Sequence, residues 1–216
     1  MNCVYAIPGL GTTKELYAFI KLNNAEVKVL EWPAYDKEET LQSYAKKLTD
    51  QIDQSEPFYL MGVSYGGMLS TEISRIIEPR KTFLISTCEF DHELPAGIKL
   101  FRIFPLYEIV TDSMLRSMAK SAKIILGVRN NYRKGFYKMI DSVPKGYFKQ
   151  SIRNIVKWKS SGEGRNVVRI HGNKDSLIRF SDAIKKRTHY VIESGTHAMI
   201  LEKAKEISAI LDAHIK

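Results

Sequence analysis

The stretch Phe58-Tyr59-Leu60-Met61-Gly62-Val63-Ser64-Tyr65-Gly66-Gly67 decides the architecture that we expect for this chain. The four apolar residues at its start indicate a buried β-strand, and residues 67–77 after it have the apolar spacing of a helix. Between the two lies the pattern Gly-x-Ser-x-Gly, in which a serine occupies a tight turn and the flanking glycines avoid collisions with neighbouring backbone. The stretch therefore predicts a strand, a sharp turn that exposes the Ser64 hydroxyl, and a helix.

The same turn gives a special position to the backbone N–H of Tyr65, at the start of the predicted helix. An N–H group there has no acceptor within the helix, and the helix dipole favours negative charge beside it. We therefore expect the Tyr65 amide to stabilise an oxyanion that develops next to Ser64. The structural alternative is a glycine-rich helix start in which Ser64 is only a turn residue.

Strand-like and helix-like stretches alternate through both ends of the chain. Runs rich in β-branched and aromatic residues predict strands at residues 4–7, 27–30, 58–61, 82–86, 167–171 and 190–192. Helix-like spacing occurs at residues 14–20, 41–52, 67–77 and 197–213. The strands are continuously apolar, as expected when helices cover both faces of a parallel sheet. The sequence predicts an α/β fold with a doubly wound, mostly parallel sheet of about six strands, and a site beyond the carboxyl ends of those strands.

A serine hydroxyl needs two further residues before it acts as a nucleophile at neutral pH. A neutral imidazole must take its proton, and an acceptor, preferably a carboxylate, must hold the second ring nitrogen. Asp175 follows the predicted strand 167–171, and His197 follows the predicted strand 190–192. Both belong to the same sheet edge as Ser64, in the chain order that such a serine turn uses. We expect Ser64, Asp175 and His197 to form a catalytic triad.

Other residues compete for these roles. Glu89 and Asp91 follow the predicted strand 82–86 and are rival acids, and the alternative for Asp175 is a turn residue that closes its loop. Cys88 lacks a turn that would expose it, so we expect a small buried residue. The alternative for His197 is a residue that merely starts a helix. The remaining histidines are expected to be structural or solvated; they are His92, His171, His189 and His214.

The chain resembles the α/β-hydrolases, in particular the small microbial serine hydrolases of that superfamily. The matching stretches are Pro8-Gly9-Leu10-Gly11, Gly62-Val63-Ser64-Tyr65-Gly66-Gly67, His171-Gly172-Asn173-Lys174-Asp175 and Ser194-Gly195-Thr196-His197, spread over about two-thirds of the chain. The resemblance implies that Ser64 is the nucleophile, Asp175 the acid and His197 the base. It also implies an oxyanion hole formed by the amides of Tyr65 and of Leu10 or, next, Gly11.

Two departures from the superfamily pattern affect these expectations. Pro8-Gly9 stands where many members have His-Gly, which leaves the choice between Leu10 and Gly11 open. The chain begins almost at the first matched strand, so we expect the two strands that usually precede it to be missing and the sheet to be minimal.

The net charge of +9 comes from one central block. Residues 91–165 contain fifteen Lys or Arg and six Asp or Glu, whereas the rest of the chain contains eighteen of each. Because the superfamily inserts a cap at this place, the resemblance predicts a hydrolase core of residues 1–90 and 166–216 and an inserted, mainly helical, basic cap of residues 91–165.

Two interpretations of this cap stay open. In one, its cations attract an anionic substrate or an acidic lipid surface and its apolar residues line an acyl site, the candidates being Leu100, Phe101, Phe104, Leu115 and Met118. In the other, the aromatic residues are the core of the cap and the cations form a solvated face.

The sequence thus predicts a serine hydrolase that cleaves a small or medium carboxylic ester through an acyl-enzyme. The nearest alternative is the same triad acting on a thioester, a lactone or a C–C bond. An alternative of another class is a non-catalytic protein that binds anionic lipid or nucleic acid through the basic cap. The expected partner is a small acyl substrate, with no nucleic acid, no cofactor and no metal.

The chain also carries expectations about its location. No segment has the roughly 18 apolar residues of a membrane helix, and the N-terminus lacks the basic region of a secretory signal. We therefore expect a cytoplasmic protein without membrane insertion, with peripheral contact through the cap left open. Cys3 and Cys88 are expected to be free thiols, because two cysteines cannot build a disulfide framework and no Cys or His pair has zinc-site spacing.

Overall fold

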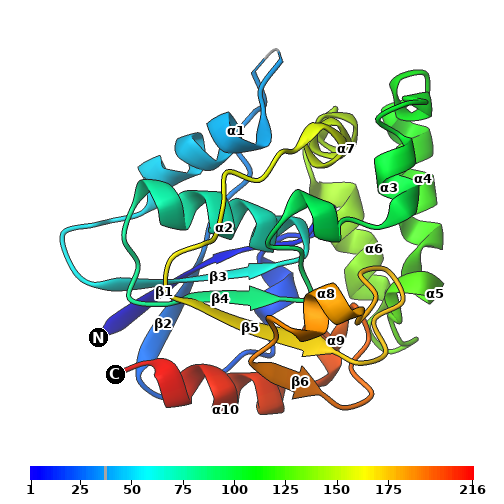
Figure 1. Ribbon diagram of the computed structural model, residues 1–216. Coiled ribbons are helices and arrows are strands. Elements are labelled where there is room, and N and C mark those ends of the chain that lie inside the picture. The colour runs from blue at the N-terminus through cyan, green and yellow to red at the C-terminus, as the bar shows by residue number, and fades with distance from the viewer. Residues whose placement is uncertain (37) are drawn as a thin grey trace.

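The computed structural model describes residues 1–36 and 38–216, and it has a parallel β-sheet between layers of helices (Figure 1). The strands are β1 (Asn2–Ile7), β2 (Ala25–Val29), β3 (Phe58–Val63), β4 (Thr82–Ile85), β5 (Val167–Gly172) and β6 (Tyr190–Ile192). Their order is β2-β1-β3-β4-β5-β6, and every neighbouring pair is parallel. The predicted parallel sheet is confirmed, and each predicted strand boundary lies within two residues of the observed one.

Helices cover both faces of this sheet, which explains the continuously apolar strands. On one face, Tyr5 of β1 belongs to a buried cluster shared with α1 (Leu41–Leu48) and α2 (Tyr65–Ile76). On the other face, the neighbouring residue Val4 belongs to a cluster shared with α10 (Ala204–His214). Successive side chains of a strand point to opposite faces, so each strand serves both clusters.

The predicted helices 41–52 and 67–77 are present with small differences. Helix α1 ends at Leu48 and continues as the 3-10 turn η2 (Thr49–Gln51). Thr40 caps its start, because the Thr40 side chain accepts a hydrogen bond from the Ser43 N–H at 3.1 Å. Helix α2 begins two residues earlier than predicted, directly after Ser64.

The other helix predictions are partly wrong. Between β1 and β2 the chain forms only the 3-10 turn η1 (Lys14–Tyr17), because a turn at residues 9–12 uses part of the short connection. The predicted helix 197–213 is two helices, α9 (Met199–Glu202) and α10, with a break at Lys203. A further helix, α8 (Asp182–Lys185), was not predicted, since a single turn is too short to show a helical period.

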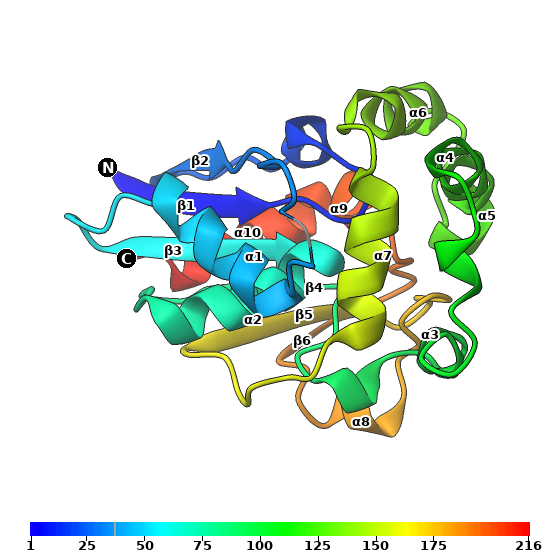
Figure 2. The same ribbon diagram turned by 90° about the horizontal axis from the view of Figure 1, so that it is seen from above.

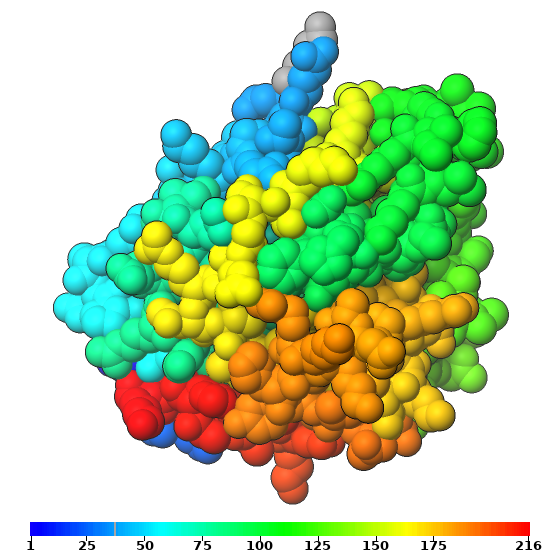
Figure 3. Space-filling view, viewed as in Figure 1, coloured from blue at the N-terminus to red at the C-terminus, as the bar shows by residue number. Residues whose placement is uncertain are grey.

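Residues 91–165 are mainly helical, as predicted; the helices of residues 96–157 lie beyond the carboxyl ends of the strands, and the chain after them runs back along α2 to the start of β5 (Figures 1 and 2). The elements are η3 (Asp91–Glu93), α3 (Ala96–Leu100), η4 (Leu106–Glu108), α4 (Asp112–Ser121), α5 (Lys123–Leu126), α6 (Arg133–Ser142) and α7 (Tyr147–Lys157). In the space-filling view, the green part of this segment lies directly against the orange chain around α8 and β6 (Figure 3).

The segment packs on the sheet layer and shares its core. Leu115, Phe136 and Phe148 belong to the same hydrophobic cluster as Val4 and Ile170 of the sheet. Leu115, one of the expected lining residues, is buried in this core. Leu100, Phe104 and Met118, from the same group of expected lining residues, are exposed. The division of the chain into a core and an inserted cap domain stays a prediction.

Among the described residues, no helix combines the length and the apolar character needed to cross a bilayer.

Candidate active site

Ser64 occupies a strained turn between β3 and α2. Its backbone angles are φ 53° and ψ −119°, a combination that residues with a side chain rarely adopt. The Ser64 N–H donates to the Ile85 carbonyl at 3.0 Å. The Ser64 carbonyl accepts from the Gly67 N–H at 2.9 Å and from the Thr87 hydroxyl at 2.5 Å. These hydrogen bonds hold the strained conformation. Thr87 was not predicted to have this role, although it directly follows the predicted strand 82–86 at the carboxyl edge of the sheet.

Gly66 is required by the close approach of the start of α2 to the end of β1. A Cβ atom on Gly66 would lie 2.0 Å from the Ile7 carbonyl oxygen and 2.4 Å from that of Pro8. These distances are too short for any side chain, so the position requires glycine. This approach brings the turn of residues 9–12 next to the serine. A Cβ atom on Gly9 would lie only 3.6 Å from the Cβ atom of Ser64.

Ser64, His197 and Asp175 are joined by two hydrogen bonds. His197 Nε2 lies 3.0 Å from Ser64 Oγ, and His197 Nδ1 lies 2.8 Å from Asp175 Oδ2. The other carboxylate oxygen, Oδ1, accepts from the N–H groups of Leu177 and Ile178, both at 2.9 Å. With Nδ1–H donated to the buried carboxylate, Nε2 is left to accept the proton of the serine hydroxyl. The structure therefore brings together the three side chains that the sequence singled out.

The rival acids have other partners. Glu89 is buried and lies 3.2 Å from the guanidinium Nε of Arg187. Asp91 lies 3.5 Å from the guanidinium of Arg102. Of the three candidate acids, Asp175 is the one whose carboxylate is hydrogen-bonded to an imidazole next to the serine.

His171, which was expected to be structural, lies directly behind Asp175. Its Nε2 is 2.8 Å from the Ile178 carbonyl oxygen and 3.5 Å from Asp175 Oδ2. Burial lowers the pKa of His171, so the imidazole is neutral at neutral pH and its Nε2–H donates to the Ile178 carbonyl. His171 thus braces the loop that carries the carboxylate.

Two groups of backbone amides lie beside Ser64. The Tyr65 N–H is at the first position of α2, where the helix offers no acceptor. The turn after β1 is closed by the Thr12 N–H, which donates to the Gly9 carbonyl at 3.1 Å. This closing bond does not use the amides of Leu10 and Gly11.

The Tyr65 side chain connects the serine turn to α7. The Tyr65 hydroxyl lies 2.9 Å from the Tyr35 hydroxyl and accepts from Asn154 Nδ2 at 3.5 Å. The Tyr35 hydroxyl in turn lies 2.8 Å from Ser151 Oγ. Burial raises the pKa of Tyr65 to about 12, so the hydroxyl stays protonated. Sequence analysis could not find this network, because its members come from three segments that only the fold brings together.

The loop that carries His197 contacts the end of α5. The Ala198 N–H donates to the Leu126 carbonyl at 2.9 Å. Gly127, with φ 74°, lies so close to Thr196 that a Cβ atom on it would be 2.4 Å from Thr196 Cβ. The end of α5 therefore supports the loop that carries the candidate base.

The cysteines take no part in this arrangement. Cys3 and Cys88 are free thiols, as predicted. Cys88 is buried, and burial raises the pKa of its thiol, so its thiolate is scarce at neutral pH.

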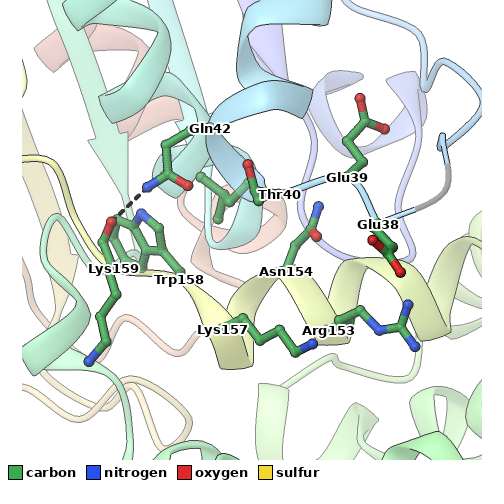
Figure 4. A pocket seen from close by; sticks show the side chains of 10 residues that line it. Glu38, Glu39, Thr40, Gln42, Arg153, Asn154, Lys157, Trp158 and Lys159 are labelled. Carbon is green, nitrogen blue, oxygen red and sulfur yellow. Dashed lines mark hydrogen bonds between the residues drawn. The ribbon is translucent and has the colours of Figure 1, made fainter.

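A cavity of about 530 Å³ opens elsewhere, between α1 and α7 (Figure 4). Its lining is mainly polar and of mixed charge, with Glu39 on one side and Arg153 and Lys157 on α7. It does not include Ser64, Asp175 or His197. We therefore do not assign it to an acyl substrate.

Comparison with known proteins identifies the fold. No family model matches the chain, and no curated relative matches it. Among solved structures, a thermophilic esterase from Thermogutta terrifontis superposes with a TM-score of 0.78 at 13% identity, covering 99% of this chain and 89% of that one. A lipase-esterase related protein from Clostridium acetobutylicum gives 0.71 at 16% identity, covering 99% and 94%. An esterase from Exiguobacterium antarcticum gives 0.71 at 14% identity, covering 99% and 91%.

These similarities extend over nearly the whole chain. Because the sequence identities are only 13–16%, they show a shared fold and no more. Together with the six-stranded parallel sheet and the serine turn after β3, they establish that this chain has the α/β-hydrolase fold.

Proposed function

We propose that this protein is a serine hydrolase that cleaves a small or medium carboxylic ester. The observation that carries the proposal is the hydrogen-bonded chain from Asp175 through His197 to Ser64 at the carboxyl edge of the sheet. The fold shared with proteins described as esterases supports the same reaction class. Fold alone does not fix the reaction, so the argument depends on the site.

The proposed mechanism has two steps. In the first, Ser64 Oγ attacks the ester carbonyl while His197 Nε2 takes the hydroxyl proton, and Asp175 stabilises the imidazolium. The amides of Tyr65 and Leu10, or Gly11 in place of Leu10, hold the oxyanion of the tetrahedral intermediate. His197 then gives its proton to the leaving alkoxide, and the acyl group remains on Ser64.

In the second step, water attacks the acyl-enzyme. His197 takes a proton from the water and returns it to Ser64 Oγ as the carboxylic acid leaves. Ester and water are the reactants, so the proposed mechanism needs neither a metal nor an organic cofactor. A cytoplasmic location belongs to the same proposal and is supported by the two free thiols.

Steady-state hydrolysis of p-nitrophenyl acetate and butyrate tests the proposal. Wild-type protein should release p-nitrophenol, and Ser64→Ala should lower kcat/KM at least about 10³-fold, because the nucleophile is lost. Equal rates for wild type and a folded Ser64→Ala variant would refute the proposed nucleophile.

The same triad suits a thioester, a lactone or an activated C–C bond. Parallel assays on an acyl-thioester and a γ-lactone separate these substrates, since the ester proposal predicts the largest kcat/KM for the ester. A nucleic-acid partner is not part of the proposal, because the positive charge of residues 91–165 is spread over the segment without a nucleic-acid-binding motif.

A further inference from the structure

One end of the molecule exposes many large apolar side chains. In the described part of the chain, nine of the fourteen exposed large hydrophobic residues lie within residues 100–125. Ile109 is 82% exposed, Ile124 80% and Ile103 70%. We call this set the apolar cap face; it consists of Leu100, Ile103, Phe104, Leu106, Ile109, Met114, Met118, Ile124 and Ile125. Single exposed apolar residues are ordinary, but a gathering of this size indicates a binding surface.

The elements that carry the apolar cap face lie together. Helices α3, α4 and α5 stand at the end of the molecule opposite the two termini in both ribbon views (Figures 1 and 2). Within α4, Leu115 is buried in the core, whereas Met114 and Met118, one turn apart, are exposed. One side of the helix is anchored, and another side offers its apolar residues to the outside.

The charge around the apolar cap face is positive. Residues 99–125 contain two acids, and each is bound in an ion pair: Glu108 lies 2.6 Å from Arg153, and Asp112 lies 2.9 Å from Arg116. Lys99 donates to a backbone carbonyl, which leaves its charge uncompensated. Lys123 lies over the ring of Tyr137, which also leaves its positive charge in place.

The apolar cap face borders the candidate active site. Ile124 and Ile125 directly precede Leu126, whose carbonyl accepts the Ala198 N–H next to His197. A surface bound to this face therefore lies close to the chain that carries the candidate base.

We propose that the apolar cap face docks on an anionic lipid bilayer. Its apolar side chains enter the boundary between headgroups and acyl chains, and its cations meet the anionic headgroups. A second copy of the chain fits less well, because joining two such faces brings like charges together. The docking itself needs no catalysis; that it brings lipid-borne esters to Ser64 rests on the proposed function.

Co-sedimentation with vesicles tests the docking. Wild-type protein should bind vesicles of phosphatidylcholine mixed with phosphatidylglycerol more tightly than vesicles of phosphatidylcholine alone, and added salt should weaken the binding. The double variant Ile109→Ser, Ile124→Ser should lose at least about tenfold in apparent affinity, because two apolar anchors are removed. Ile76→Ser is the matched control, since Ile76 is 48% exposed on α2, and it should bind like wild type.

Several results would overturn the docking proposal. These are no vesicle binding, equal binding to both vesicle types, and an equal loss for the double variant and the Ile76→Ser control. A dimer in sedimentation velocity that the double variant dissociates would assign the face to a second copy.

Two further measurements separate this proposal from the proposed function. Ser64→Ala should bind vesicles like wild type, and the double variant should hydrolyse a water-soluble ester like wild type. An inactive wild type that still binds anionic vesicles would refute only the proposed hydrolase.

Discussion

Asp175 uses its two carboxylate oxygens for different tasks. Oδ1 is fixed by the two backbone N–H groups of Leu177 and Ile178, and Oδ2 faces His197 Nδ1. Because the backbone bonds fix the carboxylate, the imidazole has one favoured orientation and one favoured tautomer. The negative charge of Asp175 is therefore expected to matter as much as its shape.

The first prediction concerns this charge. Asp175→Asn should lower kcat for ester hydrolysis by about 10³- to 10⁴-fold, because an amide can present its N–H to Nδ1 and thus favours the wrong tautomer of His197. Asp91→Asn, at the half-buried rival acid, should leave kcat within about twofold of wild type, because Asp91 is paired with Arg102 and not with His197. Steady-state kinetics of both variants decide between the two acids, and a larger loss for Asp91→Asn would reverse the assignment.

The second prediction concerns His171. Burial lowers the pKa of His171 in the folded chain below the ordinary value of 6.5. Between the lowered pKa and 6.5, the unfolded chain therefore binds more protons than the folded one. His171 therefore contributes stability that is complete above pH 6.5 and is lost as the pH falls through that window.

Urea unfolding at about pH 7.5 and about pH 5.5 measures this effect. The free energy of unfolding of wild type should fall more between these pH values than that of His171→Gln. His214, whose pKa is also lowered, titrates in both proteins and cancels in the comparison. An identical pH dependence for the two proteins would contradict the assignment of a neutral buried His171.

At the scale of elements, the end of α5 supports the loop of the candidate base. The third prediction is that Gly127→Ala lowers kcat at least about tenfold, because its Cβ would collide with Thr196 and displace His197 from Ser64. Gly146→Ala is the matched control: Gly146 also has positive φ, 80°, but a Cβ atom there meets nothing within 4 Å.

Kinetics and thermal unfolding of both variants separate position from stability. Both variants should lose some stability because of the positive φ, Gly127→Ala more because of the collision, and only Gly127→Ala should lose kcat while KM stays nearly unchanged. Equal kcat for the two variants would show that the contact between α5 and the His197 loop does not position the base.

The elements themselves were predictable to different degrees. Strands such as β3 were found because a buried parallel strand is a short, continuous apolar run between turn signals. The single-turn helix α8 and the break at Lys203 were not predicted, because a stretch of a few residues is too short to show a helical spacing of apolar residues. The role of Leu115 could not be fixed from the sequence, because an apolar residue on an amphipathic helix has the same pattern whether it faces a pocket or the core.

At the scale of the whole molecule, a buried ion pair joins distant parts of the chain. Arg169 of β5 is completely buried, and its guanidinium donates to both carboxylate oxygens of Glu93 at 2.8 and 2.7 Å. It also donates to the carbonyl of Thr87, whose hydroxyl holds the turn of Ser64. The pair thus connects β5, the chain after β4 and the serine turn.

The fourth prediction follows from its burial. Arg169→Met should lower the free energy of unfolding by about 3–5 kcal/mol, because the Glu93 carboxylate is left buried without its partner. The double variant Arg169→Met, Glu93→Leu should recover much of that loss, since both charges are removed. Urea unfolding measures both, and a double variant as unstable as the single one would contradict this account.

The candidate site was more predictable than its support. Ser64, Asp175 and His197 could be singled out because each follows a strand at the same sheet edge and each residue type has one role in the chemistry. Arg169 and Tyr35 could not, because their partners are distant in sequence and a lone arginine or tyrosine has no local signature.

The central claim is that the hydrogen-bonded chain from Asp175 to Ser64 makes Ser64 a nucleophile. Labelling with a fluorophosphonate probe, mapped by mass spectrometry, tests it on wild type, Ser64→Ala and His197→Ala. The account predicts one adduct, on Ser64, that is absent in Ser64→Ala and forms at least about 10²-fold more slowly in His197→Ala. A folded wild-type protein that forms no adduct at Ser64, or forms it equally fast without His197, would contradict the account.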